Sequence, residues 1–176
     1  MRHTVLPALG LILLACASPA LAQRRVPAIH PDVTVFVGLT TSAARPTIGG
    51  AFGGGGSIVR FEVEFAGTRG AGTATRPSQG GISANITVQS PKPTHGIQFY
   101  VIGGIGFYGE TFGGGGGSGE VGAKNIGLGG RMKLAGTLRL RLDYRVFVLG
   151  SAPDATPGLV LQRHPQRVAV GLNFAF

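Results

Sequence analysis

Acidic and basic residues alternate with apolar residues in two segments of this chain. Glu62 and Glu64 follow Arg60 at every second position. In the segment 138–146, apolar or aromatic residues occupy the even positions and charged residues the odd positions, which are Arg139, Arg141, Asp143 and Arg145. A period of two sends alternate side chains to opposite faces of a β-strand. Each segment is therefore predicted to be a strand with one apolar face and one ionic face.

Two carboxylates on one strand face could act as the acid and base of a glycosidase. A second possible role for Glu62 and Glu64 is ion pairing with arginine, because a guanidinium binds a carboxylate through bidentate hydrogen bonds. We therefore predict ion pairs between these glutamates and the arginines of 138–146.

Other arrangements that could do chemistry are weaker. A hydrolase needs a nucleophile within reach of a base, and His164 shares one predicted loop with Ser151 and Asp154 without a recognisable spacing. The run 113–117 resembles a phosphate-binding loop, but the Gly-Lys-Ser/Thr of that motif is missing. No His, Asp or Glu cluster has the spacing of metal ligands. The sequence thus predicts no catalytic, cofactor or metal site, and no enzyme.

The N-terminus predicts export. A basic start precedes an apolar run, and Ala20-Leu21-Ala22 offers a cleavage site for a signal peptide spanning 1–22. Export through the Sec pathway would leave 23–32 as a short periplasmic lead-in. An alternative is lipidation at Cys16, which is the chain's one cysteine. Cleavage after Ala22 would remove that cysteine, so the mature protein would have no disulfide.

The composition bears on possible partners. The net charge of +9 would suit a nucleic-acid-binding protein. Export and the alternation of the arginines along strands argue against that class, and we predict no nucleic-acid partner. Charged residues are nevertheless scarce, at 13% of the chain, and mean hydropathy is +0.28. A chain with this export signal and this hydropathy suits a membrane protein that crosses the bilayer with strands.

Eight segments have strand periodicity. They lie at about 33–40, 47–53, 60–65, 82–88, 97–107, 125–134, 138–146 and 168–176. The connections after the second, fourth and sixth segments are short, and those after the third, fifth and seventh are longer. Short periplasmic turns and longer external loops are typical of bacterial outer-membrane barrels. We therefore predict an all-β fold: an eight-stranded antiparallel up-and-down transmembrane β-barrel over 33–176.

The non-apolar face decides between a membrane barrel and a soluble one. In the first, fourth, fifth and eighth segments this face consists mostly of Gly, Ala, Ser, Thr, Asn and Gln. Such residues solubilise an exterior poorly but fill a narrow barrel well. The opposite orientation would aim the arginines of 138–146 at lipid, at roughly 2–4 kcal/mol each near the bilayer midplane.

Three segments carry a resemblance to a known family. They are Asn125–Lys133, the strand Leu140–Arg145 and the terminus Phe174-Ala175-Phe176. They resemble the small outer-membrane β-barrels, which include the OmpA-like and OmpX-like domains. The resemblance implies that Phe174 and Phe176 form the signal recognised by the barrel-assembly machinery. The chain departs from the family in having no Trp and in its long glycine runs.

These patterns lead to a set of functional expectations. The protein is expected in the bacterial outer membrane, with a structural or surface-interaction role and an external ligand that the sequence does not identify. A network is expected to plug the lumen, composed of Glu62, Glu64, Arg139, Arg141, Asp143 and Arg145. Outer-membrane lipid and lipopolysaccharide are expected to bind arginines of the external connections, namely Arg45, Arg69, Arg76 and Arg163. The alternatives are a narrow pore for small solutes and a periplasmic or lipid-anchored ligand-binding barrel.

Overall fold

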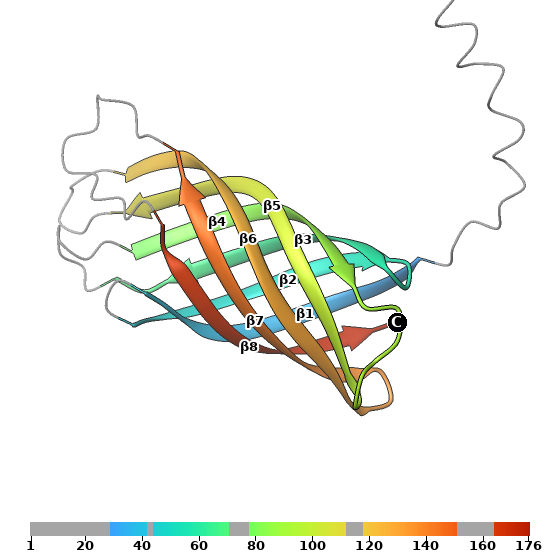
Figure 1. The fold of residues 1–176 in the computed structure, drawn as a ribbon. Helices are drawn as coiled ribbons and strands as arrows, with labels where there is room; N and C mark the ends of the chain where they lie inside the picture. The colour runs from blue at the N-terminus through green and yellow to red at the C-terminus, as the bar shows by residue number, and fades with distance from the viewer. Residues whose placement is uncertain (1–28, 42–43, 71–77, 112–117, 151–163) are drawn as a thin grey trace, which may run out of the picture.

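A computed structural model describes residues 29–41, 44–70, 78–111, 118–150 and 164–176. These residues form eight antiparallel strands that close into a barrel in sequence order (Figure 1). The strands are β1 His30–Thr40, β2 Arg45–Gly55, β3 Val59–Thr68, β4 Ser78–Gln89, β5 Ile97–Thr111, β6 Ser118–Ala135, β7 Leu138–Leu149 and β8 Gln166–Ala175. The predicted fold class is confirmed.

Several strands extend beyond the predicted segments. β1 begins at His30 rather than Val33, and β5 and β6 remain paired up to Thr111 and Ser118. The periodicity of apolar residues marks only the part of a strand whose outer face is apolar. Backbone hydrogen bonds continue past that part, because a ladder needs no apolar side chain. Residues 30–32, predicted as lead-in, therefore belong to the barrel.

The strands are strongly staggered around the barrel. Following paired residues from His30 through all eight strands leads back to β1 at Thr40, a displacement of ten residues along that strand. Such a stagger is the geometric consequence of strand tilt in a closed barrel. Residues opposite each other across the lumen therefore do not occupy equivalent positions in their strands.

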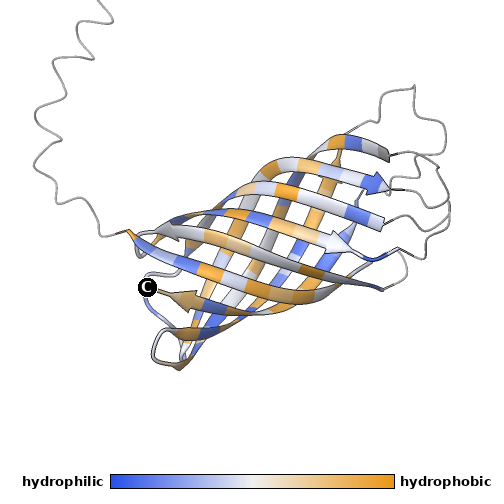
Figure 2. Ribbon diagram, turned by 180° about the vertical axis from the view of Figure 1, so that it is seen from behind, coloured by the Kyte–Doolittle hydropathy of each residue, from blue (hydrophilic) through white to orange (hydrophobic). Residues whose placement is uncertain are grey.

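The barrel is polar inside and apolar outside. The outer face carries Val, Ile, Leu and Phe side chains, among them Val35, Phe65 and Ile105, which are 52%, 57% and 66% exposed. Most buried side chains are polar or charged. Figure 2 shows the result as apolar and polar residues alternating along the strands. This arrangement is the reverse of a soluble ligand-binding barrel, which places its apolar side chains inside.

Among the aromatic side chains that point inward, Phe36 and Tyr100 lie against glycines that make room for them. Phe36 of β1 pairs with Gly49 of β2 and Gly171 of β8. Tyr100 of β5 pairs with Gly129 of β6. A Cβ atom at any of these three glycines would collide with the aromatic side chain beside it. Part of the glycine content is thus explained by the narrow lumen.

The predicted turn at Ala135-Gly136-Thr137 is confirmed, and Gly136 has a φ of 51°. At the β4–β5 connection, His95 and Gly96 also have positive φ values, 51° and 79°. Figure 1 places the C-terminus, the start of β1 and these turns at one end of the barrel. Among the described residues, no helix is both long enough and apolar enough to cross a membrane.

Candidate functional site

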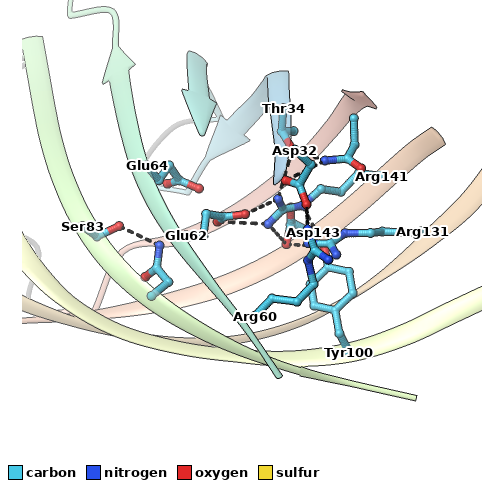
Figure 3. Close-up of polar contacts among 12 residues, drawn as sticks. Asp32, Thr34, Arg60, Glu62, Glu64, Ser83, Tyr100, Arg131, Arg141 and Asp143 are labelled. Atoms are coloured by element: carbon cyan, nitrogen blue, oxygen red, sulfur yellow. Dashed lines mark hydrogen bonds and ion pairs between the residues drawn. The ribbon is translucent and has the colours of Figure 1, made fainter. Parts of the chain in front are cut away.

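The interior of the barrel is crossed at mid-height by ion pairs between β3 and β7. Glu62 of β3 accepts hydrogen bonds from both terminal nitrogens of Arg141, with 3.2 Å between Nη2 and Oε1. Arg145 Nη2 also lies 3.1 Å from Glu62 Oε1. β3 and β7 are not neighbours in the sheet, so these side chains bridge the lumen (Figure 3). The predicted pairing of β3 glutamates with β7 arginines is present.

A second set of ion pairs lies nearer the β1–β2 and β3–β4 connections. Glu64 Oε2 lies 2.9 Å from Arg145 Nη2. The other oxygen, Glu64 Oε1, accepts a hydrogen bond of 2.6 Å from Arg167 Nη2. Arg167 belongs to β8, so Glu64 connects β3 with two further strands.

Arg141 is also hydrogen-bonded to Asp143 of its own strand, β7, and to Tyr100 of β5. Arg141 Nε donates to Asp143 Oδ2 at 2.6 Å and to the Tyr100 hydroxyl oxygen at 3.0 Å. The same hydroxyl donates to Asp143 Oδ1 at 2.7 Å. The guanidinium groups of Arg131 and Arg141 lie 4.9 Å and 5.4 Å from the centre of the Tyr100 ring, within cation–π range.

A third layer lies toward the end where the C-terminus is found. Asp32 of β1 forms an ion pair with Arg60 of β3 and accepts a hydrogen bond of 3.1 Å from Asn173 Nδ2. Arg131 Nη1 donates to Gln89 Oε1 at 3.1 Å. Ion pairs and hydrogen bonds therefore occupy successive levels of the lumen.

The central charges are almost completely enclosed. Arg145 is 0% exposed, Arg141 1%, Glu64 3% and Glu62 5%. A buried charge is tolerated when opposite charges and hydrogen bonds compensate for lost water. In the described part of the chain, six arginines and five carboxylates are buried, so the buried charges nearly balance in number.

Little free space is left beside the network. A cavity of about 40 Å³ lies next to Glu64 and Arg167 and is also lined by Thr68, Tyr108 and Asn125. A volume of this size holds a few water molecules, since one needs ~10–15 Å³ by this measure. The polar arrangement can therefore fill the lumen and fix opposite walls of the barrel to each other.

The structure departs from the sequence prediction at Arg139. Its side chain is half-buried and makes no ion pair with the described residues. The prediction includes Arg139 because it shares a strand face with Arg141 and Arg145, and a match of depth with Glu62 would require equal counting of positions along β3 and β7. The stagger of the barrel invalidates that count and brings Arg141 and Arg145 to the level of Glu62 instead.

The four predicted rim arginines fall into different environments. The prediction for Arg45, a lipid contact in an external connection, was wrong. Arg45 is the first residue of β2, where its strand position faces inward, and it is 9% exposed and interacts with other residues. Arg69 is exposed just after β3, as predicted. Arg76 and Arg163 lie outside the described residues.

Sequence reasoning missed several members of the network. Arg131 and Arg167 occupy inward-facing strand positions, so the alternation itself was the available signal. Arg60 was placed on the ionic face of its strand, but its pairing with Asp32 was not predicted. Asp32 was missed because it was placed in the lead-in. Tyr100 was assigned to the polar face, but its role required knowledge of which strand lies opposite.

Within the described residues, no three His, Cys, Asp or Glu side chains are grouped so that they could hold a metal ion. His30, His95 and His164 are all exposed. Ser151 and Asp154, considered with His164 as a weak hydrolase candidate, lie outside the described residues.

Comparisons with known proteins give a consistent fold. No family model matches the chain, and no curated protein matches its sequence. Three similar solved structures are the N-terminal β-barrel domain of Pseudomonas aeruginosa OprF, neisserial surface protein A (NspA) and Ail, the attachment invasion locus protein of Yersinia pestis.

The likeness extends over nearly the whole of each known structure. The OprF domain has a TM-score of 0.64 at 15% identity, covering 84% of this chain and 97% of that one. NspA has a TM-score of 0.66 at 12% identity, with the same coverage. Ail has a TM-score of 0.52 at 11% identity, covering 86% of this chain and all of that one. This chain therefore has the fold of the small eight-stranded outer-membrane β-barrels.

Proposed function

We propose that this protein is a non-enzymatic outer-membrane β-barrel with a structural or surface-interaction role in the cell envelope, and that its ionic network plugs the lumen. One observation carries the proposal: buried ion pairs fill the interior, and apolar side chains cover the exterior. A barrel of this kind is suited to a hydrocarbon surrounding and does not offer an open path through its centre.

The strand lengths support a membrane location. Six of the strands in the described chain, all except β5 and β6, have 10–12 residues. A tilted transmembrane strand needs roughly 9–11 residues to cross the hydrocarbon core. The exposed apolar side chains lie on every strand, so they form a continuous surface rather than the local patch of a docking site.

The connections support an orientation. The connections β2–β3, β4–β5 and β6–β7 have three, seven and two residues and share one end of the barrel with the C-terminus (Figure 1). At the other end, β3–β4 and β7–β8 are longer, with nine and 16 residues, whereas β1–β2 and β5–β6 have four and six. Short turns of outer-membrane barrels face the periplasm. We therefore place the C-terminus in the periplasm and the β1–β2, β3–β4, β5–β6 and β7–β8 connections outside. Lipopolysaccharide is then a proposed partner of exposed Arg69.

Cell fractionation tests the proposed location. The full-length protein, expressed in a Gram-negative host, should be recovered with outer membranes after carbonate washing. In unheated samples it should run on gels at a mobility different from that of heated samples, as a folded barrel. Recovery in the soluble periplasmic fraction would support the periplasmic ligand-binding barrel instead. Conductance in planar lipid bilayers separates a plugged barrel from a narrow pore.

A further inference from the structure

Lys124 is an unusual residue of the outer face. Outward-facing positions of β6 alternate with inward-facing ones, and Lys124 is exposed on the same face as Ile126 and Leu128. Its partners in the ladder are Ile105 of β5 and Val148 of β7, which also face outward. The cationic side chain therefore has apolar neighbours on both sides.

Few other charges face outward. On the strands of the described chain, the one other outward Asp, Glu, Lys or Arg is Glu120, four residues before Lys124 in β6. Glu120 pairs with Gly109, beyond the apolar residues of β5. Consistent with this separation, no ion pair of Lys124 is found among the described residues.

The register places Lys124 near one edge of the apolar surface. Its neighbour Val148 is the penultimate residue of β7. One outward position further along, β6 carries Gly122 opposite Phe107 of β5. In the proposed orientation this is the external edge, at the level of the outer-leaflet headgroups. A lysine there can keep its methylenes on apolar side chains and extend its ammonium to the polar layer.

An apolar groove lies beside this lysine on the outer surface. Its lining includes Ile82, Ile105, Phe107, Val148 and Lys124 itself. Gly122 also lines it, and a Cβ atom at Gly122 would meet nothing within 4 Å. The surface beside the lysine is thus hollowed where the strand carries glycine, and a hydrocarbon chain fits such a hollow.

We propose that Lys124 and this groove form a binding site for a phosphorylated lipid of the outer leaflet. The ammonium of Lys124 binds the lipid phosphate, and one acyl chain lies in the groove over Gly122. Charge complementarity and the apolar lining together select an anionic amphiphile over a free ion or a neutral hydrocarbon. The inference rests on the proposed membrane location and orientation.

The test uses the full-length protein folded in nanodiscs and the lipids that remain bound in native mass spectrometry. Three nanodisc compositions serve as probes: phosphatidylcholine alone, phosphatidylcholine with phosphatidylglycerol, and phosphatidylcholine with lipid A. Lys124→Met removes the charge and keeps an unbranched apolar side chain. Lys133→Met is the matched control, because Lys133 lies on the same strand and faces inward at the opposite end of the barrel.

Wild type should retain an anionic lipid that Lys124→Met retains about tenfold less, as expected for loss of one charge-assisted contact. Lys133→Met should match wild type, and Lys124→Arg should restore retention. Gly122→Leu fills the groove and should lower retention while leaving Lys124 in place. Enrichment of phosphatidylglycerol or of lipid A identifies which phosphorylated lipid is bound.

Equal retention by wild type, Lys124→Met and Lys133→Met would overturn the proposal. Heat-modifiable gel mobility, measured first on every variant, shows that each barrel is folded. Failure of the wild type to insert into any nanodisc would contradict the proposed membrane location itself. Insertion without lysine-dependent retention would contradict the lipid site alone.

Discussion

At the scale of single residues, Glu62 joins two arginines of the interior, so its substitution is expected to lower the stability of the barrel. The residue is 5% exposed, and its carboxylate is shared by Arg141 and Arg145, which come from a strand on the other side of the lumen. Removing it would leave two enclosed guanidinium groups with fewer acceptors. Breaking a buried ion pair in this way typically costs about 3–5 kcal/mol, and water in the lumen would reduce the loss.

Glu62→Gln should therefore lower the unfolding midpoint of the barrel in urea. Because the chain contains no tryptophan, unfolding in detergent is followed by far-UV circular dichroism. Glu120→Gln is the matched control, because Glu120 is exposed on the outward face of β6. The control should unfold as wild type does. Equal midpoints for the two variants would show that the buried carboxylate contributes no more than the exposed one.

Tyr100 and Tyr144 offer a second pair for comparison. The Tyr100 hydroxyl links Asp143 and Arg141 inside the barrel, whereas the Tyr144 hydroxyl donates to Gln166 on the outer face. Tyr100→Phe keeps the ring beneath the arginines and removes the hydroxyl. Hydrogen bonds to charged groups contribute about 1.5–3 kcal/mol each, so we expect a loss of this order. Tyr144→Phe should change the unfolding free energy by less, and the reverse ranking would refute the assignment.

The residues of the network were only partly predictable from the sequence. Alternation showed that Glu62, Glu64 and the β7 charges share the interior, because strand periodicity is a local property. Pairing across the lumen depends on the ten-residue stagger, which is a property of the closed barrel. The predicted network therefore included Arg139, which makes no ion pair with the described residues, and omitted Arg167, which pairs with Glu64.

At the scale of secondary-structure elements, the glycines of β6 have different roles according to the face on which they lie. Gly129 faces inward, where an added Cβ would collide with the Tyr100 ring and with the carbonyl of Leu142 in β7. Gly122 faces outward, with no atom within 4 Å of such a Cβ. The same substitution is thus expected to act oppositely at two positions of one strand.

Gly129→Ala should destabilise the barrel by about 1–3 kcal/mol, the usual range for overpacking an interior. Gly122→Ala should be neutral or slightly stabilising, because alanine restricts the unfolded chain more than glycine does. Urea unfolding in detergent measures both. A Gly129→Ala barrel as stable as wild type would show that the interior around Tyr100 is loosely packed.

The last strand carries a prediction about assembly. The backbone NH of Phe176 donates to Pro31 O of β1, and its side chain is 71% exposed. The ring therefore makes little contribution to packing and is available to another protein. Deleting Phe176 should reduce membrane insertion without abolishing export, because the resemblance to outer-membrane barrels implies an assembly signal there. Normal abundance and normal heat-modifiable mobility of the deletion variant would argue against that role.

The ends of the strands were less predictable than their centres. The apolar alternation located all eight strands, since one face of each carries apolar side chains on the outside of the barrel. It failed at β5 and β6, where Glu110 pairs with Gly119 beyond the apolar surface. Glycine and polar residues on both faces leave no periodic signal there, although the backbone ladder continues.

At the scale of the whole molecule, the barrel is organised as an ionic core within an apolar shell. The shell follows from composition and alternation and was predictable. The degree of enclosure was not, because it depends on how side chains from five strands (β1, β3, β5, β7 and β8) interlock at the centre. That enclosure is the basis for proposing a closed barrel rather than a pore.

Single-channel recording in planar lipid bilayers tests this account most directly. The wild-type barrel should insert and carry no steady current, because the Glu62 and Glu64 ion pairs occupy the lumen. Glu62→Gln combined with Glu64→Gln should unfold more easily and admit current. That current should favour anions, since three buried carboxylates would then face six buried arginines among the described residues. A steady current through the folded wild-type barrel would contradict the account, as would a double variant with wild-type stability and no current.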